Sequence, residues 1–531
     1  MTYRKTWFSY VLWVIYTMLC VIFLVFAGNY VCASYLSDSF WNTGLSLPVK
    51  DLTVQWFGLV MLPATAVVYG IVRWIADRIR KKYAGGETAK KIAECIVVWA
   101  FLTVGIFLRA MYALDAIQMQ KAAENSAQNY VGGIEYFEKA VVTAGGFVEP
   151  LSYGGAYFYV VCLSFILSFL GNKAVSAIIL QVFLQVAGLI LAYVTTRKLA
   201  GRIPAGAVLL YLSCSPAYLE MLKILGPECL FFDLYLLVML AAVSLVKGYC
   251  GGRLTKAASL AGALAVGVLI GALSYLDLAA FTLLVIMAAA VVGKKKHKED
   301  VTVNHVSGLD AAVVLMALLS CAVGLCAALG LLSLNRGTSF QGEITVWVAQ
   351  QIGNSRTFGF RPLYPYSLDM LLFGGLTVMA AFLVFEFFRG GREQNYMLWI
   401  FLCIVAAPTP LAVFGVQPLG LLSMYLWGVL AGLGLQNCIL GRKTQLMKTL
   451  IEEINQAAEE LLQKTEAERS EEAVSEPKSS ETSAITNPRF LENPLPLPKK
   501  HVPRQMDYQY HVEDAKMKYD VEVKEEDDFD I

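Results

Sequence analysis

The chain has 531 residues, of which 57% are hydrophobic and only 16% are charged, and its formal net charge is +1. Soluble domains contain about 45–50% apolar and about 25% charged residues, so the composition excludes an ordinary soluble enzyme. Apolar runs of roughly 18–24 residues recur and are long enough to cross a hydrocarbon core about 30 Å thick. The sequence therefore predicts an all-α polytopic membrane protein with about 12–13 hydrophobic helices, loops on the outer face, a cytosolic helix and a disordered tail.

Residues 1–112 predict three spans. The apolar run 8–30 is too long for a signal-peptide core and follows a short basic start, so we expect a retained span that begins in the cytosol. The run 54–75 ends at a basic cluster, which places that end in the cytosol. The third span, 92–112, then leads to a long outer loop.

The segment 153–195 contains two apolar runs separated by Gly171-Asn172-Lys173, and a basic cluster follows from Arg197. Two full crossings would place this cluster outside, contrary to the preference of basic residues for the cytosolic side. We therefore expect the run 153–170 to be partly re-entrant or to lie at the membrane interface. Irregular backbone at that depth requires cover from protein or a water-filled cavity.

The remaining apolar runs alternate regularly across the membrane. We expect spans at 205–222, 229–247, 257–274, 277–293, 309–333, 368–388, 396–413 and 417–438. The strongly basic turns then fall on one side, so we expect a multi-pass protein of the cell membrane with both termini in the cytosol.

The chain divides into three predicted parts. Residues 1–440 form the transmembrane domain. Residues 441–470 show apolar spacings of 3 and 4 and predict a cytosolic amphipathic helix. Residues 471–531 are rich in Pro and acidic residues and predict a disordered C-terminal tail, which is either a solvated anchor or a docking site for a cytosolic partner.

Four carboxylates near the first outer loop are candidate catalytic bases. A carboxylate beside the bilayer can accept a proton from an acceptor group, especially where partial burial favours its neutral form. The alternative is that each is a solvated loop or helix-end residue. The candidates are Asp115, Glu135, Glu138 and Glu149.

Basic residues on the second outer loop, 334–366, are candidates for binding a donor phosphate, because a guanidinium fork matches phosphate oxygens. Their alternative role is interfacial anchoring. These residues are Arg336, Arg356 and Arg361. A second outer patch places Lys223 and Glu228 on either side of Gly226-Pro227, where they orient substrate or pair with each other.

The sequence gives little indication of a cofactor. No CxxC pair or Cys/His cluster suggests zinc, and no phosphate-binding glycine motif or HExxH appears in a convincing context. No cofactor is certain, and a divalent metal remains an option beside the outer carboxylates.

Several segments resemble the GT-C glycosyltransferases, a family that includes protein mannosyltransferases and the lipid A aminoarabinose transferase. The similar segments are Pro150 to Tyr159, Phe169 to Asn172, Gln181 to Gly201, and Gly226-Pro227-Glu228, within about residues 92–250. The resemblance implies transfer of a hexosyl or pentosyl group from a polyprenyl-phosphate donor to an envelope acceptor on the outer face. It also implies an acidic residue ahead of paired aromatics, and Glu135-Tyr136-Phe137 is similar to that arrangement, although the family's Asp is absent.

Two other functions are consistent with the sequence. A transporter or flippase for lipid-linked glycans would show internal repeats and paired broken helices, and the sequence shows no such repeat. A catalytically silent membrane scaffold would explain the altered acidic motif. The expected partners are a polyprenyl-phosphate-linked sugar, membrane lipid and a cytosolic partner of the tail, with no nucleic acid.

Overall fold

The computed structural model describes residues 7–31, 50–82, 87–124, 134–145, 156–250, 253–292, 308–354, 367–388, 421–422 and 424–439. These residues form helices joined by turns, and no β-strand occurs among them. Six of the helices are long and apolar enough to cross a membrane, and a bent pair raises the number to seven. Large apolar side chains on the spans are exposed, as for Trp99 and Phe107, which are 63% and 60% exposed. The chain is an all-α polytopic membrane protein.

The six long spans lie in helices that follow the predicted apolar runs. They are α3 (Lys50–Lys82), α4 (Glu87–Glu124), α7 (Ala174–Ala200), α10 (Glu228–Cys250), α11 (Lys256–Leu276) and α13 (Gly308–Arg336). Shorter apolar helical segments lie within α1 (Trp7–Val31), α6 (Ala156–Leu170), the 3₁₀ helix η3 (Leu278–Phe281) with α12 (Thr282–Val292), α15 (Ser367–Phe388), and Met424–Ile439.

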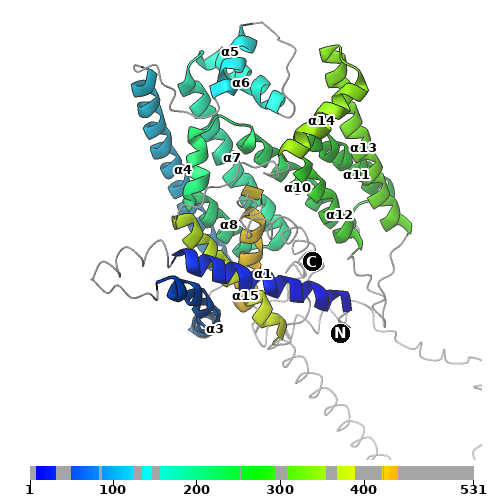
Figure 1. The fold of residues 1–531 in the computed structure, drawn as a ribbon. Helices are drawn as coiled ribbons and strands as arrows, with labels where there is room; N and C mark the ends of the chain where they lie inside the picture. The colour runs from blue at the N-terminus through cyan, green and yellow to red at the C-terminus, as the bar shows by residue number, and fades with distance from the viewer. Residues whose placement is uncertain are drawn as a thin grey trace, which may run out of the picture. The chain divides into compact units, whose positions relative to one another are not determined.

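The α7 helix lies at the centre of a part of the bundle that carries many buried polar side chains. It packs against α4, α10 and α8 (Arg202–Cys214), and α4 also packs against α8 (Figure 1). The α7 helix buries Gln181, Gln185 and Thr196 completely. A buried polar side chain requires a partner in a membrane interior, so these residues indicate a polar interior between the four helices.

The predicted span 205–222 is broken rather than continuous. Its first part is α8, and its second part is α9 (Pro216–Glu220) with the 3₁₀ helix η2 (Met221–Lys223), bent by 55°. The break follows from Pro216, which lacks an N–H and cannot continue the hydrogen-bond ladder of α8. Ser215 begins the new helix, because its side chain accepts a hydrogen bond from the backbone N–H of Tyr218 at 3.4 Å.

A close contact between α11 and α13 depends on glycine. A Cβ on Gly271 would meet the carbonyl oxygen of Cys321 and lie 2.8 Å from the backbone nitrogen of Leu325. Likewise, a Cβ on Gly324 would meet the backbone of Val268. Small residues allow membrane helices to approach at backbone distance, so α11 and α13 form a tightly packed pair in parallel register.

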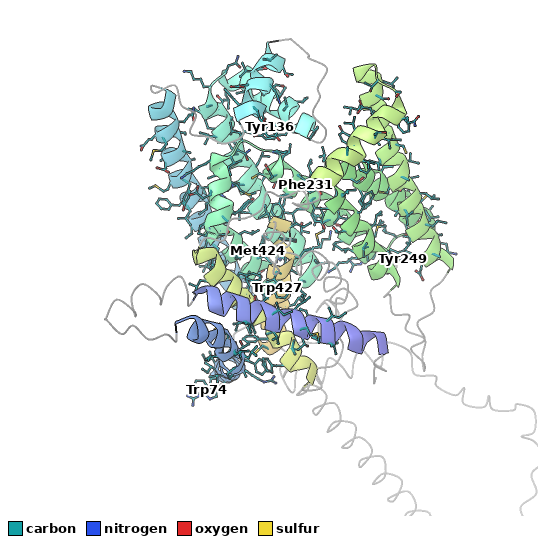
Figure 2. The ribbon with its side chains drawn as sticks, in the orientation of Figure 1. Trp74, Tyr136, Phe231, Tyr249, Met424 and Trp427 are labelled. Atoms are coloured by element: carbon teal, nitrogen blue, oxygen red, sulfur yellow. The ribbon has the colours of Figure 1, made fainter. Side chains whose placement is uncertain are left out.

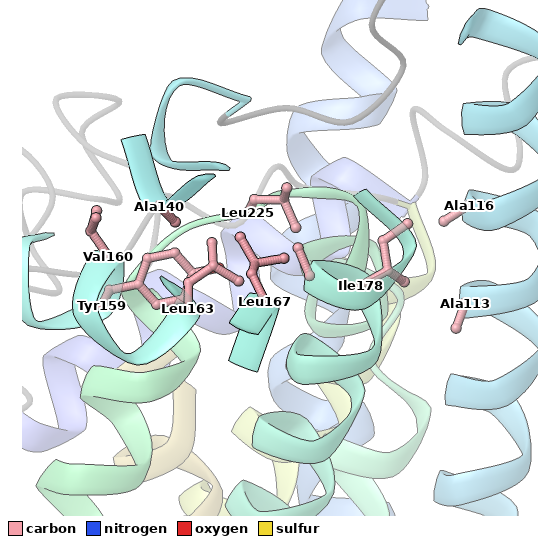
Figure 3. Close-up of a cluster of buried hydrophobic side chains, with 10 residues drawn as sticks. Ala113, Ala116, Ala140, Tyr159, Val160, Leu163, Leu167, Ile178 and Leu225 are labelled. Atoms are coloured by element: carbon pink, nitrogen blue, oxygen red, sulfur yellow. The ribbon is translucent and has the colours of Figure 1, made fainter. Parts of the chain in front are cut away.

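Two short helices, α5 (Ile134–Ala144) and α6, pack against each other and against the ends of α4 and α7. Figure 3 shows the apolar cluster between them, which includes Ala116, Tyr159 and Leu167. The α6 helix has 15 residues, which correspond to a length of about 22 Å at 1.5 Å per residue. It is shorter than the hydrocarbon core, as we expected for an interfacial or re-entrant segment, and its placement in a membrane stays a prediction.

The first helix is fixed by contacts with the segments nearest the C-terminal end of the described residues. Trp427, labelled in Figure 2, packs edge-on against Phe23 at 5.1 Å between ring centroids. Its indole N–H donates a hydrogen bond to Thr377 of α15 at 3.0 Å, and Tyr16 donates one to the carbonyl of Ala380 at 2.8 Å. These contacts stabilise α1 against α15.

One helix end and one additional helix differ from the sequence-based expectation. The α4 helix continues to Glu124, beyond the predicted end of the third span at residue 112. A further helix, α14 (Phe340–Asn354), lies within the predicted second outer loop. The hydropathy pattern predicts where an apolar run ends, whereas α4 continues through polar residues with good helix propensity. Residues 441–531, which hold the predicted amphipathic helix and tail, lie outside the described residues.

Candidate functional site

An ionic cluster joins the end of α4 to η2. The ammonium of Lys223 lies 3.1 Å from a carboxylate oxygen of Asp115 and 3.5 Å from one of Glu220. It also lies 5.5 Å from the ring centroid of Tyr112. The Lys223 side chain is 17% exposed and that of Asp115 is 48% exposed. The cluster is therefore accessible to solvent at one edge, while the lysine is held by groups from two elements.

The sequence explains why these groups meet. Tyr112 and Asp115 are three residues apart and share one face of α4, and the bend after Ser215 brings η2 against α4 and α7. A continuous helix through Pro216 would have carried Lys223 in a different direction. The arrangement can bind an anion through Lys223, and its carboxylates can accept a proton or hold the ammonium in place.

A buried amide connects this end of the bundle to α6. The Gln181 side-chain nitrogen donates hydrogen bonds to the Tyr159 hydroxyl at 2.8 Å and to the carbonyl of Gly226 at 3.1 Å. Glu228 begins α10, and its carboxylate lies against Gly226, where a Cβ would clash with it. The Gln181 amide therefore fixes the backbone at Gly226, next to the Glu228 carboxylate.

Arg109 lies inside the bundle and is completely buried. Its guanidinium donates hydrogen bonds to the carbonyl of Gly105 at 3.0 Å and to that of Leu212 at 3.1 Å. Leu212 is four residues before Pro216, so its carbonyl has lost the N–H that a continuous helix would supply. Arg109 supplies the missing donor, and it also lies 4.9 Å from the ring centroid of Tyr218.

The predicted bases Glu135 and Glu138 lie on a helix rather than on a loop. Both are exposed on α5, while Tyr136 between them packs edge-on against Tyr159 at 6.1 Å between centroids. Within the described residues, no hydrogen bond or ion pair joins either carboxylate to Lys223. The structure thus brings together Asp115 and Lys223 of the predicted set and leaves Glu135 and Glu138 facing solvent beside them.

Several predicted site residues cannot be located. Glu149, Arg356 and Arg361 lie outside the described residues, and Arg336 is the last residue of α13, with a side chain that is not described. In the described ranges, no group of three or more His, Cys, Asp or Glu side chains is placed to hold a metal ion. The candidate phosphate-binding arginines and the divalent metal therefore stay predictions.

Among the buried ionisable residues that sequence reasoning missed, Arg109 and Asp233 are the two that lie close to Tyr218. Arg109 is 0% exposed and Asp233 is 7% exposed. The sequence does indicate both residues, because each is a lone charged residue within an apolar run. Such residues in membrane spans commonly mark functional sites. The sequence alone does not show that the helix bends at Pro216. This bend brings Tyr218 between α4, which carries Arg109, and α10, which carries Asp233.

Comparison with known proteins gives few matches. No protein-family profile matches the chain, and no curated protein sequence matches it. Solved structures of the Archaeoglobus fulgidus oligosaccharyltransferase resemble it weakly. The structure tethered with an acceptor peptide containing the NVT sequon via a disulfide bond has 14% sequence identity and a TM-score of 0.40, and the match covers 68% of this chain and 51% of that chain.

The complex of the same enzyme with Zn and sulfate has 14% identity and a TM-score of 0.36, and the match covers 66% of this chain and 51% of that chain. The chain therefore spans about half the length of the enzyme structures that it matches. A similarity of this size carries no conclusion about activity.

Proposed function

We propose that the chain is an integral membrane glycosyltransferase of the GT-C type. It moves a hexosyl or pentosyl group from a polyprenyl-phosphate donor to an envelope acceptor on the outer face of the cell membrane. The observation that carries the proposal is the pairing of Lys223 with Asp115 at 3.1 Å, at the end of a membrane-spanning bundle. The resemblance of residues 92–250 to GT-C enzymes supports it.

The donor's own chemistry explains why a lysine at this place is useful. A polyprenyl chain lies in the bilayer, so its phosphate sits at the membrane surface and requires a cation there. A partly exposed ion pair contributes only about 0–1 kcal/mol, so a phosphate can displace Asp115 from Lys223 at little cost. The displaced carboxylate is then free to accept a proton close to the reacting sugar.

The proposed reaction requires a base for the acceptor. As the acceptor oxygen or nitrogen bonds to the sugar's anomeric carbon, the bond from that carbon to the phosphate oxygen breaks. The acceptor's proton passes to a carboxylate, and the polyprenyl phosphate leaves. Glu135 is the first candidate for this base, with Glu138, Glu149 and Asp115 as the alternatives.

The experiment is a transfer assay with the purified full-length chain in lipid vesicles and radiolabelled polyprenyl-phosphate sugars. Lys223→Gln should raise KM for the donor roughly 10- to 100-fold, because charged hydrogen bonds contribute about 1.5–3 kcal/mol, with a smaller change in kcat. Lys256→Gln, at the start of α11, is the control and should leave KM unchanged.

The base is identified in the same assay by four single variants. Glu135→Gln should lower kcat roughly 10²–10⁴-fold with donor binding retained, which is the usual contribution of general-base catalysis. Glu138→Gln, Glu149→Gln and Asp115→Asn are measured beside it. Loss of transfer in one of these three and not in Glu135→Gln would reassign the base. Normal transfer in all four would refute the proposed site.

A second function is favoured by the break in the α8–α9 span. A transporter or flippase for lipid-linked glycans commonly binds its substrate at discontinuous helices near buried charges, and Tyr218 beside the break lies against Arg109. Measuring the movement of a fluorescent lipid-linked glycan between leaflets tests it. Movement without sugar transfer would favour this function over glycosyl transfer.

A further inference from the structure

Asp233 differs from the other buried carboxylates of the described residues. Four carboxylate side chains are buried there, and three of them accept a hydrogen bond. The three pairs are Asp277 with the backbone N–H of Ala279 at 2.7 Å, Asp310 with Tyr249, and Glu343 with Thr338 at 2.7 Å. No described group donates to either oxygen of Asp233, although Asp233 and Asp277 are equally buried at 7% exposure.

The hydroxyl of Tyr218 lies near Asp233. The position that a Cβ on Gly188 would occupy lies 2.7 Å from a carboxylate oxygen of Asp233 and 2.7 Å from the hydroxyl of Tyr218. That hydroxyl is buried and lies within reach of the Arg109 guanidinium, and no described hydrogen bond joins it to Asp233. Both oxygens therefore lie against the same face of α7, at a residue without a side chain.

Gln185 contributes a third oxygen from one turn earlier on α7. Its side-chain nitrogen donates to the carbonyl of Tyr218 at 2.6 Å, which orients the amide. Its side-chain oxygen is buried and receives no hydrogen bond from a described group. Three elements, α7, α9 and α10, thus contribute buried oxygens to this part of the bundle, and no described group donates to those of Asp233 and Gln185.

The donor set decides which ligand fits. A buried carboxylate with neutral oxygens suits a hard cation, which binds oxygen ligands, whereas the charge of Asp233 would repel an anion. A single carboxylate balances one positive charge. The guanidinium of Arg109, 4.9 Å from the Tyr218 ring centroid, opposes a second positive charge in the same low-dielectric region. The arrangement therefore fits a monovalent cation better than a divalent one.

We propose that Asp233, Tyr218 and Gln185 form a binding site for one small monovalent cation of the sodium class inside the helix bundle. Discontinuous membrane helices are a common setting for such sites, and Tyr218 belongs to the short helix that follows the break. Asp233 comes five residues after the first residue of α10, about 7–8 Å along the helix axis. The site is therefore close to the end of the bundle that carries Lys223.

The test is direct binding of radioactive sodium ion to the purified full-length chain, without any sugar donor. The wild-type chain should bind the label saturably, and unlabelled sodium chloride should displace it while choline chloride at the same ionic strength does not. Asp233→Asn should reduce the affinity at least tenfold. Asp277→Asn is the matched control, because it changes an equally buried carboxylate that already has a partner, and it should retain binding.

Tyr218→Phe is the second variant, because it removes one oxygen and keeps the ring against Arg109. It should weaken sodium binding several-fold. This variant tests the site if Asp233→Asn does not fold, that is, if it is not monodisperse with wild-type helicity. Absence of saturable binding in the wild-type chain would refute the site, as would equal loss in Asp277→Asn. Binding of protons without sodium dependence would also refute it. None of these results depends on sugar transfer, so this inference and the proposed function fail separately.

Discussion

Replacing Arg109 with methionine tests whether this residue satisfies the carbonyl that Pro216 leaves without a donor. Arg109→Met removes the hydrogen bond to the Leu212 carbonyl at 3.1 Å. The carbonyl is then buried without a donor, which costs about 1–3 kcal/mol. The loss of the cation–π contact with Tyr218 adds about 2 kcal/mol when desolvated. Removing a buried cation relieves several kcal/mol of desolvation, so the net effect of the single change is not diagnostic.

A double-mutant cycle isolates the carbonyl. Pro216→Ala supplies a backbone N–H where Leu212 can use it, so Arg109→Met should destabilise this background less than the wild type. We expect a coupling of about 1–2 kcal/mol in favour of the double variant, close to the cost of one unsatisfied buried carbonyl. The gains and losses of each single change cancel in the cycle.

The assay is equilibrium unfolding in mixed detergent micelles, followed by helicity. The control cycle pairs Arg109→Met with Pro204→Ala, because Pro204 lies in the first turn of α8 and does not face the Leu212 carbonyl. That pair should be additive. A coupling within about 0.5 kcal/mol of zero for the Pro216 cycle would refute the explanation of why Arg109 is buried.

Three further predictions concern the contact between α11 and α13, the arginines of the second outer loop, and the side of the membrane on which Lys443 lies. Gly271→Ala should lower the free energy of unfolding by about 1–3 kcal/mol through overpacking, measured in the same micelle assay. Gly330→Ala, where a Cβ meets nothing within 4 Å, should instead be neutral or stabilising, and equal effects of the two would contradict the close approach of α11 and α13. Replacing Arg336, Arg356 and Arg361 together with glutamine should weaken binding of a labelled lipid phosphate in an equilibrium assay. An unchanged affinity would show that these arginines do not bind the donor phosphate. A cysteine placed near Lys443 should resist an impermeant reagent added outside intact cells, and its modification there would overturn the predicted cytosolic end.

The apolar pattern was sufficient to locate the long spans. The predicted runs 229–247 and 309–333 correspond closely to Glu228–Cys250 and Gly308–Arg336, because a membrane requires both an apolar surface and a fully bonded helical backbone. The pattern could not predict the extension of α4, whose last residues are polar but favour helix.

The candidate site was only partly predictable. Asp115 and Lys223 were each identified as candidates, but their pairing depends on the bend that Pro216 produces, which the predicted span 205–222 did not include. The buried acid Asp233 is visible in the sequence as a charge within an apolar run. Its missing partner is visible only in three dimensions, because it depends on which groups of α7 and α9 face it.

The glycine-lined contact between α11 and α13 has a consequence for biosynthesis. The α11 helix packs far more extensively against α13, whose last residue is Arg336, than against α12, the next helix to be made. At about 5–20 residues per second of synthesis, α11 waits several seconds in the membrane with the surface around Gly271 uncovered. During that interval lipid tails or the insertion machinery must cover the surface of α11 around Gly271. Assembly of this pair therefore has to follow emergence of the later helix from the ribosome.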